Sequence, residues 1–206
     1  MLKPDFHFTL HSSKSCEMVV HLSTNKSLNL PPLVPDLTRV DQITALGIIF
    51  NNTLSCGPHV NLITAKASAS FYALKTFKSH SLDGPAQWDV AWATLLAQIR
   101  YRSPSWRGFI NANKANKLQT ILNKVKQSNF LLSDFSVLEE LSDSANSALF
   151  RAVLTISEHV LYRLLPPRTK TGYNLRKRSH DLMLPEAKSS FLQNNFLIHM
   201  LYANVY

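Results

Sequence analysis

The apolar residues that follow residue 55 recur every three or four positions, and this spacing constrains the fold more than any other feature of the chain. The residues in question are Val60, Ile63, Ala67, Phe71 and Leu74. Positions three and four apart lie on one side of an α-helix, so the pattern predicts a helix that begins near Ser55, a possible cap, and ends near His80. A helix with one apolar side buries that side against other elements. We therefore expect a helical bundle.

Two further segments show the same spacing. The first should begin at Gly84 and Pro85, because proline is tolerated in the first turn of a helix, and should end at Pro104. We expect it to bury Trp88, Trp92, Leu95, Leu96 and Ile99. The second, residues 114–127, has an apolar side and a largely cationic side, formed respectively by Leu118, Ile121, Leu122 and Val125 and by Lys117, Lys124 and Lys126.

Later segments continue the helical pattern. Residues 137–141, 145–156 and 158–165 are expected to form short helices, with Leu149, Val153 and Ile156 facing inward. An apolar segment at 191–202 should pack back onto the bundle.

Strand patterns precede the helices. Segments 16–22 and 43–50 are short and rich in β-branched residues, with a proline-rich connection between them, and the alternation at 6–11 allows a weak third strand. The predicted fold class is therefore α+β. We expect a small N-terminal antiparallel β element over residues 1–54, a helical bundle over 55–165, and a basic extended arm with a short C-terminal helix over 166–206.

The arm has an unusual composition. Residues 166–185, PPRTKTGYNLRKRSHDLMLP, contain five Lys or Arg, a central Tyr173 and no acid before Asp181. The two leading prolines oppose a helix, and no apolar period would fold the segment alone, so a partner should order it. Arginines beside an aromatic ring suit the phosphates and bases of a nucleic acid. A solvated tail or a nuclear-import signal is the alternative interpretation.

Positive charge is concentrated in two segments of a chain whose formal net charge is +9. Residues 84–129 hold seven Lys or Arg against Asp89, and residues 163–180 hold six against no acid. Such confinement is typical of a nucleic-acid-binding surface, and we expect the cations to form one positive strip. The candidate binding residues are Arg100, Arg102, Arg107, Lys117, Lys124, Lys126, Arg168, Lys170, Tyr173, Arg176, Lys177 and Arg178.

Aromatic residues alternate with arginines in RYRSPSWRGF, residues 100–109. Tyr101, Trp106 and Phe109 could stack on bases, as aromatic rings beside arginines do in single-strand binding proteins. They could equally fill the core at a turn. The sequence leaves both interpretations open.

The sequence does not predict an independent active site. There is no adjacent Asp pair for two-metal catalysis, and Glu139, Glu140 and Asp143 are expected on an exposed helical face. His7 and His11 have no third ligand nearby, Cys16 and Cys56 lack zinc spacing, and neither Gly-x-Ser-x-Gly nor a Gly-rich phosphate loop is present. We expect no metal and no cofactor.

No apolar run approaches the roughly twenty residues of a membrane span. The N-terminus lacks the apolar stretch of a secretory signal. We expect an intracellular protein, in cytoplasm and nucleus, with no membrane partner.

Several segments, taken in order, resemble one family. They are SSKSCEMVV (12–20), RVDQITALGIIFNNTLSCGPHV (39–60), KASASFYALKTFKSHSL (66–82), YRSPSWRGF (101–109), HVLYRLLPP (159–167) and GYNLRKRSHDLMLP (172–185). Their joint order and spacing are similar to the C-terminal third of reverse transcriptases from jockey-like non-LTR retrotransposons, the LINE elements. The match runs from residue 12 to about residue 202.

The resemblance implies the end of a polymerase palm, followed by a thumb and a tail. By similarity, Lys14 matches a palm lysine thought to assist proton transfer to pyrophosphate. Leu46 and Gly47 resemble the primer-grip turn, where backbone approaches the primer strand. The helices after Ser55 would be the thumb, which follows a template–primer duplex through its shape and phosphates.

The resemblance also implies that the chain is a fragment that lacks the catalytic aspartates of an RNA-directed DNA polymerase. We expect no polymerase activity from it alone, with Mg²⁺ relevant only if a palm domain is supplied elsewhere. Its expected role is binding of RNA or an RNA–DNA template–primer. The alternative is a non-catalytic structural fragment that self-associates or docks onto the missing palm of a complete polymerase.

Overall fold

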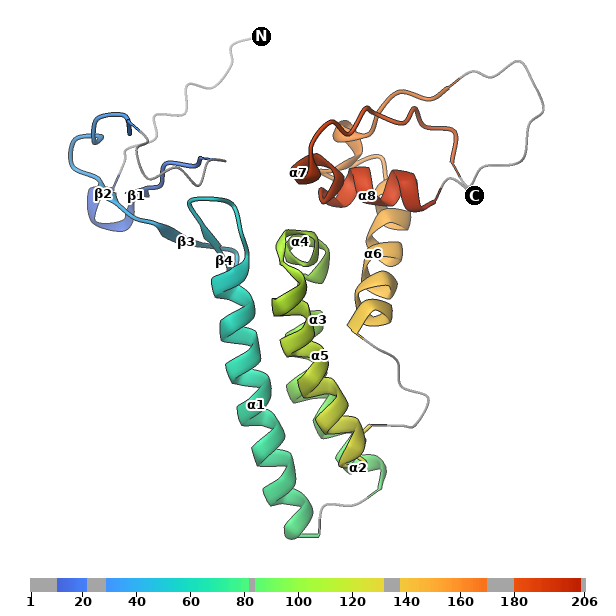
Figure 1. The fold of residues 1–206 in the computed structure, drawn as a ribbon. Coiled ribbons are helices and arrows are strands. Elements are labelled where there is room, and N and C mark those ends of the chain that lie inside the picture. Colours follow the sequence, from blue (N-terminus) through green and yellow to red (C-terminus); the bar gives the residue numbers. More distant parts are fainter. Residues whose placement is uncertain (1–10, 22–28, 82–83, 132–137, 170–179, 205–206) are drawn as a thin grey trace.

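The computed structural model describes residues 11–21, 29–81, 84–131, 138–169 and 180–204. A small β element lies at one end of a helical body, and the C-terminal helices lie on the other side of that same end (Figure 1). The elements confirm the predicted α+β class.

The helical body is built around α1 (Gly57–Ser79). All five residues of its predicted apolar side are buried, and the helix ends at Ser79, as expected from the sequence. Its N-cap position is Cys56, although the Ser55 hydroxyl also takes part by accepting the Gly57 N–H at 3.2 Å. The fully buried Val60 and Ala67 are in the main core together with residues from the following helices.

The chain returns along α1 through α2 (Pro85–Ala91), a π-helical turn (Trp92–Leu96) and α3 (Ala97–Arg100). Leu95, Leu96 and Ile99 are buried as predicted, whereas Trp88 and Trp92 are half-buried at the edge of the core. Their rings contact each other with centroids 5.6 Å apart.

The predicted end of this helix at Pro104 is wrong. The helix stops at Arg100, because Arg102 adopts a left-handed conformation with φ of 49° that no α-helix can contain. Pro104 instead lies in the first turn of the short helix α4 (Ser103–Trp106), where its missing N–H costs nothing. A 3₁₀ turn, Arg107–Phe109, follows.

Trp106 belongs to the core. Its side chain is fully buried, its indole Nε1 donates to the Tyr101 carbonyl at 3.0 Å, and its ring meets the edge of His59 at a centroid distance of 5.8 Å. Of the two interpretations that the sequence left open for this residue, the structure supports packing at a turn.

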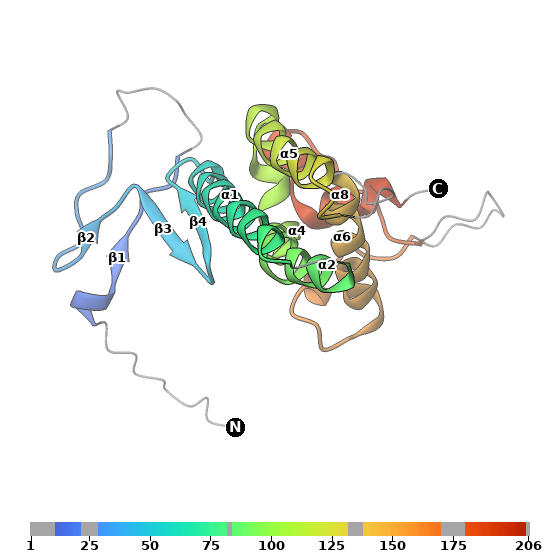
Figure 2. The same cartoon turned by 90° about the horizontal axis from the view of Figure 1, so that it is seen from below.

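α5 (Ala112–Gln127) completes the body and runs parallel to α1 (Figure 2). Near the start of both helices Lys114 Nζ donates to Asn61 Oδ1, and near their ends Lys78 Nζ donates to the Ser128 carbonyl at 3.1 Å. The buried residues of α5 are the four that the sequence predicts: Leu118, Ile121, Leu122 and Val125.

The C-terminal part differs from the prediction in two places. α6 (Leu138–Thr155) is one continuous helix instead of two short ones, and residues 158–165 form only a 3₁₀ turn, Tyr162–Leu164. Ile156 lies beyond the end of α6 and is half exposed, so its predicted inward position is wrong.

The last helices are α7 (Ser190–Gln193) and α8 (Phe196–Ala203). The apolar segment at 191–202 does pack back, as expected, and forms a second small core with α6 through Phe150, Leu182, Met200 and Leu201. Buried His180 connects the segment that contains Leu182 to α8, because its Nε2 is 2.9 Å from the Leu201 carbonyl.

The β element is smaller and differently paired than predicted. β3 (Gln42–Ala45) and β4 (Ile48–Asn51) form an antiparallel hairpin, so the predicted strand at 43–50 is in fact two strands and a turn. The predicted strand at 16–22 reduces to β1 (Cys16–Glu17) among its described residues, and it pairs in parallel with β2 (Thr38–Arg39). The possible third strand at 6–11 lies almost wholly outside the described residues.

An ion pair organises β1 and β2. Arg39 Nε donates to Glu17 Oε1 at 2.6 Å, and its other nitrogens donate to the carbonyls of Pro31 and Pro32 at 3.0 and 3.1 Å. One guanidinium thereby ties the proline-rich connection to both strands.

Changing Trp106 to Phe tests its structural role. The variant removes the indole N–H bond to the Tyr101 carbonyl and leaves a void, so we expect the free energy of unfolding to fall by about 1–3 kcal/mol. Urea unfolding of the full chain measures it. Tyr72→Phe, at a ring that is 69% exposed, should change stability by less than about 0.5 kcal/mol. A Trp106 variant as stable as this control would contradict the assignment.

Candidate nucleic-acid interface

The two parallel helices α1 and α5 carry lysines and no carboxylate. α1 reads GPHVNLITAKASASFYALKTFKS and α5 reads ANKANKLQTILNKVKQ. Their cations are Lys66, Lys75, Lys78, Lys114, Lys117, Lys124 and Lys126. Because neither helix contains Asp or Glu, no acid on either one offsets this charge.

Side-chain contacts show which lysines lie between the two helices. The Asn61–Lys114 and Lys78–Ser128 bonds mark the sides of α1 and α5 that face each other. A rotation of 100° per residue then places Lys75 on this side of α1, and Lys117 and Lys124 on this side of α5. We name this surface the lysine seam; it consists of Lys75, Lys78, Lys114, Lys117 and Lys124.

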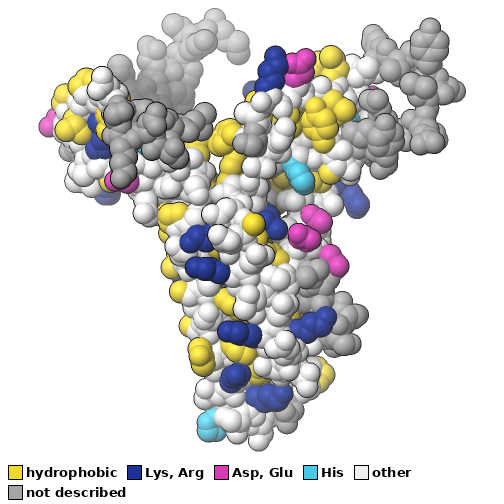
Figure 3. All heavy atoms as spheres, viewed as in Figure 1, with side chains coloured by type: hydrophobic (Ala, Val, Ile, Leu, Met, Phe, Trp, Pro, Cys, Tyr) yellow, Lys and Arg dark blue, Asp and Glu magenta, His cyan; other side chains and the backbone are white. Residues whose placement is uncertain are grey.

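The seam is exposed. Four of its lysines are exposed and Lys114 is half-buried. Figure 3 shows dark-blue Lys and Arg side chains along the helical body on the face that α1 and α5 form, with one cluster of acidic side chains to their right and others at the β element and near the C-terminal helices. In the described part of the chain, the ion pairs join Arg39 to Glu17, Arg107 to Glu139, Arg168 to Asp181 and Lys188 to Glu186, and none includes a seam lysine.

Aromatic rings support two seam lysines. The Lys75 ammonium lies 4.8 Å from the centroid of the Phe71 ring, and the Lys78 ammonium 5.3 Å from that of Phe130. Such contacts hold the long side chains against the protein while their charges stay in solvent. The ordering cost of binding an anion there is correspondingly reduced.

The seam has the length of a short stretch of nucleic acid. Lys114 and Lys124 are ten residues apart, which corresponds to about 15 Å along the helix axis. A stacked strand rises about 3.4 Å per nucleotide, so this distance covers about four nucleotides.

The structure separates the other predicted binding residues on the helical body from the seam. Lys126 lies on the opposite border of α5, seven residues after Gln119, whose Oε1 accepts the Leu138 N–H of α6. Arg100 and Arg102 are exposed where α3 ends, with the Arg102 guanidinium 5.2 Å from the Tyr101 ring. Arg107 is half-buried and faces α6, where Nη2 lies 4.0 Å from Glu139 Oε1. The expected single strip thus does not include all the predicted cations.

The predicted turn at Leu46 and Gly47 exists as the turn of the β3–β4 hairpin. Leu46 is 78% exposed, and both residues have positive φ, 50° and 84°. The Tyr101 hydroxyl donates to the Leu46 carbonyl at 3.4 Å and so joins the hairpin to the helical body. Lys14 is exposed in a 3₁₀ turn, Ser12–Lys14. The roles of these residues toward a primer or pyrophosphate stay predictions.

Part of the arm is described. Lys170, Tyr173, Arg176, Lys177 and Arg178 lie outside the described residues. Residues on each side of them pair: Arg168 bridges to Leu182, the Thr169 N–H donates to the Asp181 carbonyl at 2.6 Å, and the Met183 N–H to the Pro167 carbonyl at 2.9 Å. Residues 167–169 and 181–183 therefore lie side by side, and Arg168 also pairs with Asp181 at 3.2 Å.

Sequence reasoning missed the contribution of α1. Lys75 and Lys78 were not among the candidate binding residues, and Lys114 was counted only as a charge. One signal was available, because residues 42–82 contain no Asp or Glu. The sequence does not indicate which side of α1 faces α5, because that depends on tertiary packing.

Two buried titratable groups, His59 and Cys56, are perturbed toward their neutral forms. Both ring nitrogens of His59 are buried without a hydrogen-bond partner among the described residues. Burial lowers the pKa of His59, and the charge of Lys66 lowers it further. Burial likewise raises the pKa of the Cys56 thiol to about 11, so the thiol stays protonated at neutral pH.

The described residues contain no group of three or more His, Cys, Asp or Glu side chains placed to hold a metal ion. Within those same ranges, no helix has both the length and the apolarity needed to cross a bilayer. Comparison with family models, with curated proteins and with solved structures finds no match to this chain.

The lowered pKa of His59 predicts a pH dependence of stability. Above about pH 6.5 the residue is neutral in both states and contributes no slope. Below that value the unfolded state binds a proton at His59 that the folded state does not bind. The free energy of unfolding should therefore decrease as the pH is lowered, until the pH reaches the folded-state pKa. His59→Leu should flatten the curve below about pH 6.5 in urea titrations. Identical slopes for the wild type and His59→Leu would disprove the effect.

Proposed function

We propose that the lysine seam binds the sugar–phosphate backbone of RNA or of an RNA–DNA template–primer, as a non-catalytic part of an RNA-directed DNA polymerase of a mobile element. One observation carries the binding proposal: two parallel helices present five lysines along their line of contact and contain no carboxylate. The resemblance to the end of a LINE-type reverse transcriptase supports the assignment to a polymerase thumb.

The chemistry of the seam favours backbone over base recognition. Lysine ammonium groups are compact charges that contact phosphate oxygens without reading base edges. Binding should therefore be weakly sequence-selective and steep in salt, because each neutralised phosphate releases condensed counterions.

Replacing three exposed seam lysines tests the proposal. In Lys75→Gln/Lys117→Gln/Lys124→Gln we expect the slope of log K against log salt on single-stranded RNA to become shallower by about 2, which is about 0.7 for each phosphate that is no longer neutralised. Fluorescence anisotropy with a labelled oligonucleotide, repeated over a salt series, gives the slope. Affinity should fall at every salt concentration where counterions do not already screen the site.

Lys66 provides the matched control on the same helix. It is exposed like Lys75 and lies nine residues before it, which places it on the opposite border of α1. Lys66→Gln should change the slope by much less than one third of the triple-variant effect. An unchanged salt slope in the triple variant would refute the seam as the binding surface. So would a change of slope in Lys66→Gln as large as one third of the change in the triple variant.

A second candidate function, docking or self-association, is favoured by the apolar surface of the β element. Val20, Leu30, Leu33, Val34 and Leu46 are each 45% exposed or more. A two-residue parallel pair such as β1–β2 also has edges that can accept a further strand. Large apolar residues gathered on one small element are typical of a protein-contact surface.

Analytical ultracentrifugation tests this candidate. If the β element mediates self-association, the weight-average mass of the full chain should rise with concentration, and Leu33→Ser/Leu46→Ser should shift the dissociation constant upward by about tenfold or more. Both side chains are exposed, so folding should survive the change. A concentration-independent monomer, or a mass increase that the double variant leaves intact, would count against it.

A further inference from the structure

Three consecutive exposed side chains, Arg100, Tyr101 and Arg102, lie where α3 ends. They begin the segment RYRSPSWRGF, whose aromatic residues could either stack on bases or fill the core. The structure separates the three aromatic residues. Trp106 is buried, and Phe109 packs against the core at its edge. The Tyr101 ring is 48% exposed, so it is the aromatic side chain of this segment that a ligand can reach.

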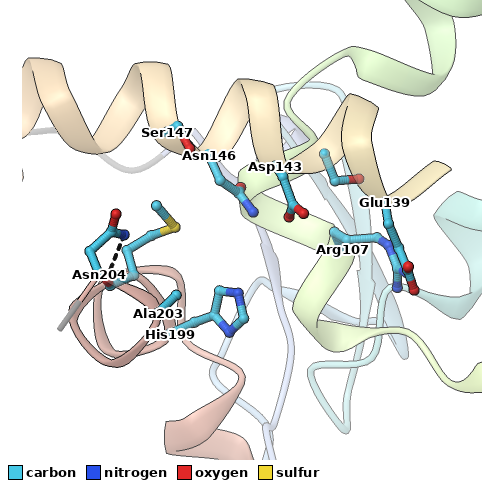
Figure 4. A pocket seen from close by; sticks show the side chains of 10 residues that line it. Arg107, Glu139, Asp143, Asn146, Ser147, His199, Ala203 and Asn204 are labelled. Carbon is cyan, nitrogen blue, oxygen red and sulfur yellow. Dashed lines mark hydrogen bonds and ion pairs between the residues drawn. The ribbon is translucent and has the colours of Figure 1, made fainter. Parts of the chain in front are cut away.

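Arg107, the last arginine of the segment, is directed elsewhere. It lines a pocket of about 600 Å³ together with residues of α6 and α8, and Figure 4 shows it beside Glu139 and Asp143 of α6. These neighbouring carboxylates offset its charge. Arg100 and Arg102 differ, because the ion pairs of the described residues include neither of them.

The turn of the β3–β4 hairpin contacts one edge of the Tyr101 ring. The hydroxyl donates to the Leu46 carbonyl at 3.4 Å, and a Cβ added to Gly47 would lie 3.4 Å from ring Cε1 and 3.5 Å from the hydroxyl oxygen. The carbon between these two atoms, Cζ, would be further away, at 3.8 Å. The turn therefore meets the ring at its edge, which positions the ring and does not cover its faces.

One face of the ring has a cation over it. The Arg102 guanidinium carbon lies 5.2 Å from the ring centroid, which is within the range of a cation–π contact. Within the described ranges no other aromatic ring stacks on Tyr101. With the hairpin at one edge and Arg102 over one face, the opposite face is the surface on which a planar group can stack.

Two residues beside the ring hold backbone conformations that their side chains disfavour. Leu46 and Arg102 have φ of 50° and 49°, in the left-handed region that residues other than glycine, asparagine and aspartate rarely occupy. Both side chains are exposed, Leu46 by 78%, so burial does not offset the strain. Strained backbone of this kind clusters at ligand sites, and here it occurs on both sides of an exposed ring.

The two segments that form this site contain no acids near it in sequence. Residues 42–82, which include the hairpin turn, have no Asp or Glu, and neither do residues 90–133. Two cations beside an exposed ring, with no acid from their own segments, attract a group that combines negative charge with a flat aromatic surface. A nucleotide of a single strand is such a group, because a phosphate lies next to an unpaired base.

We propose that Tyr101 stacks on an unpaired base of a single strand, with the Arg100 and Arg102 guanidiniums contacting neighbouring phosphates. Stacking on a ring beside arginines binds single strands with little sequence selectivity, because every base has an aromatic face. None of these residues belongs to the lysine seam, so this is a second contact for the strand. That the ligand is a nucleic acid rests on the proposed function.

Tyr101→Leu removes the ring and keeps the charge, and Tyr101→Phe is the matched control that keeps the ring. Stacking releases no counterions. In Tyr101→Leu we therefore expect affinity for a short single-stranded RNA to fall about fivefold or more with the slope of log K against log salt unchanged, and in Tyr101→Phe to stay within about twofold of wild type. Fluorescence anisotropy over a salt series measures both quantities. Wild-type affinity in Tyr101→Leu, or an equal loss in Tyr101→Phe, would overturn the inference.

A duplex distinguishes stacking from a structural role. The bases of a blunt-ended duplex are already paired and stacked on one another, so Tyr101→Leu should bind the duplex form of the same RNA as tightly as wild type does. A variant whose fold is disturbed would lose affinity for both forms of the RNA. That result would refute the stacking role.

Arg102→Gln tests the phosphate contact. The salt slope on the single strand should become shallower by about 0.7, which corresponds to one phosphate that is no longer neutralised. An unchanged slope would remove this arginine from the site.

The same measurements distinguish failure of the stacking site from failure of the seam. If Tyr101→Leu weakens single-strand binding while Lys75→Gln/Lys117→Gln/Lys124→Gln keeps the wild-type salt slope, the seam is wrong and the stacking site stands. If the triple variant has the shallower slope while Tyr101→Leu binds like wild type, the stacking site is wrong and the seam stands.

Discussion

The apolar side of α1 is the constraint on which the rest of the structure depends. Val60, Ile63, Ala67, Phe71 and Leu74 cannot be buried by α1 itself, so the returning α2–α3 segment and α5 must cover them. Once that side is covered, the rotation of α1 and α5 about their axes is fixed. Every polar residue on the two helices then has a determined position relative to the line along which they meet. Interiors packed this closely leave little freedom to change that rotation.

The lysine seam is a consequence of this rotation combined with an absence of acids. Lys75, Lys117 and Lys124 lie on the border of the buried sides, so their stems lie against the body and their charges stay in solvent. A surface of this kind attracts polyanions through Coulomb forces that extend over about a Debye length, and carboxylates on α1 or α5 would have cancelled much of it.

How far the sequence predicted this arrangement depends on the range of the interactions involved. Local spacing predicts several features that the structure confirms. These are the extents and buried sides of α1 and α5, the start of the second helix, and the exposure of Glu139 and Asp143. The pairing of Cys16 with Thr38 and the burial of Trp106 depend on residues distant in the chain, and the spacing pattern could not decide them. For the binding surface, Lys117 and Lys124 were predicted. Arg107 was predicted for the same surface but faces α6, because a turn after the left-handed Arg102 redirects the chain. The LINE-type resemblance, the arm at 170–179 and the primer-grip role of Leu46 and Gly47 stay predictions.

The central claim is that a nucleic-acid backbone lies along the line where α1 and α5 meet. Lysine-reactivity footprinting tests it most directly, because acetylation of each ammonium group can be measured by mass spectrometry with and without saturating RNA. The account predicts that RNA protects Lys75, Lys117 and Lys124 and leaves Lys66 and Lys188 as reactive as in the protein alone. Uniform protection of all five lysines, or protection of Lys66 with none at Lys117 and Lys124, would contradict it.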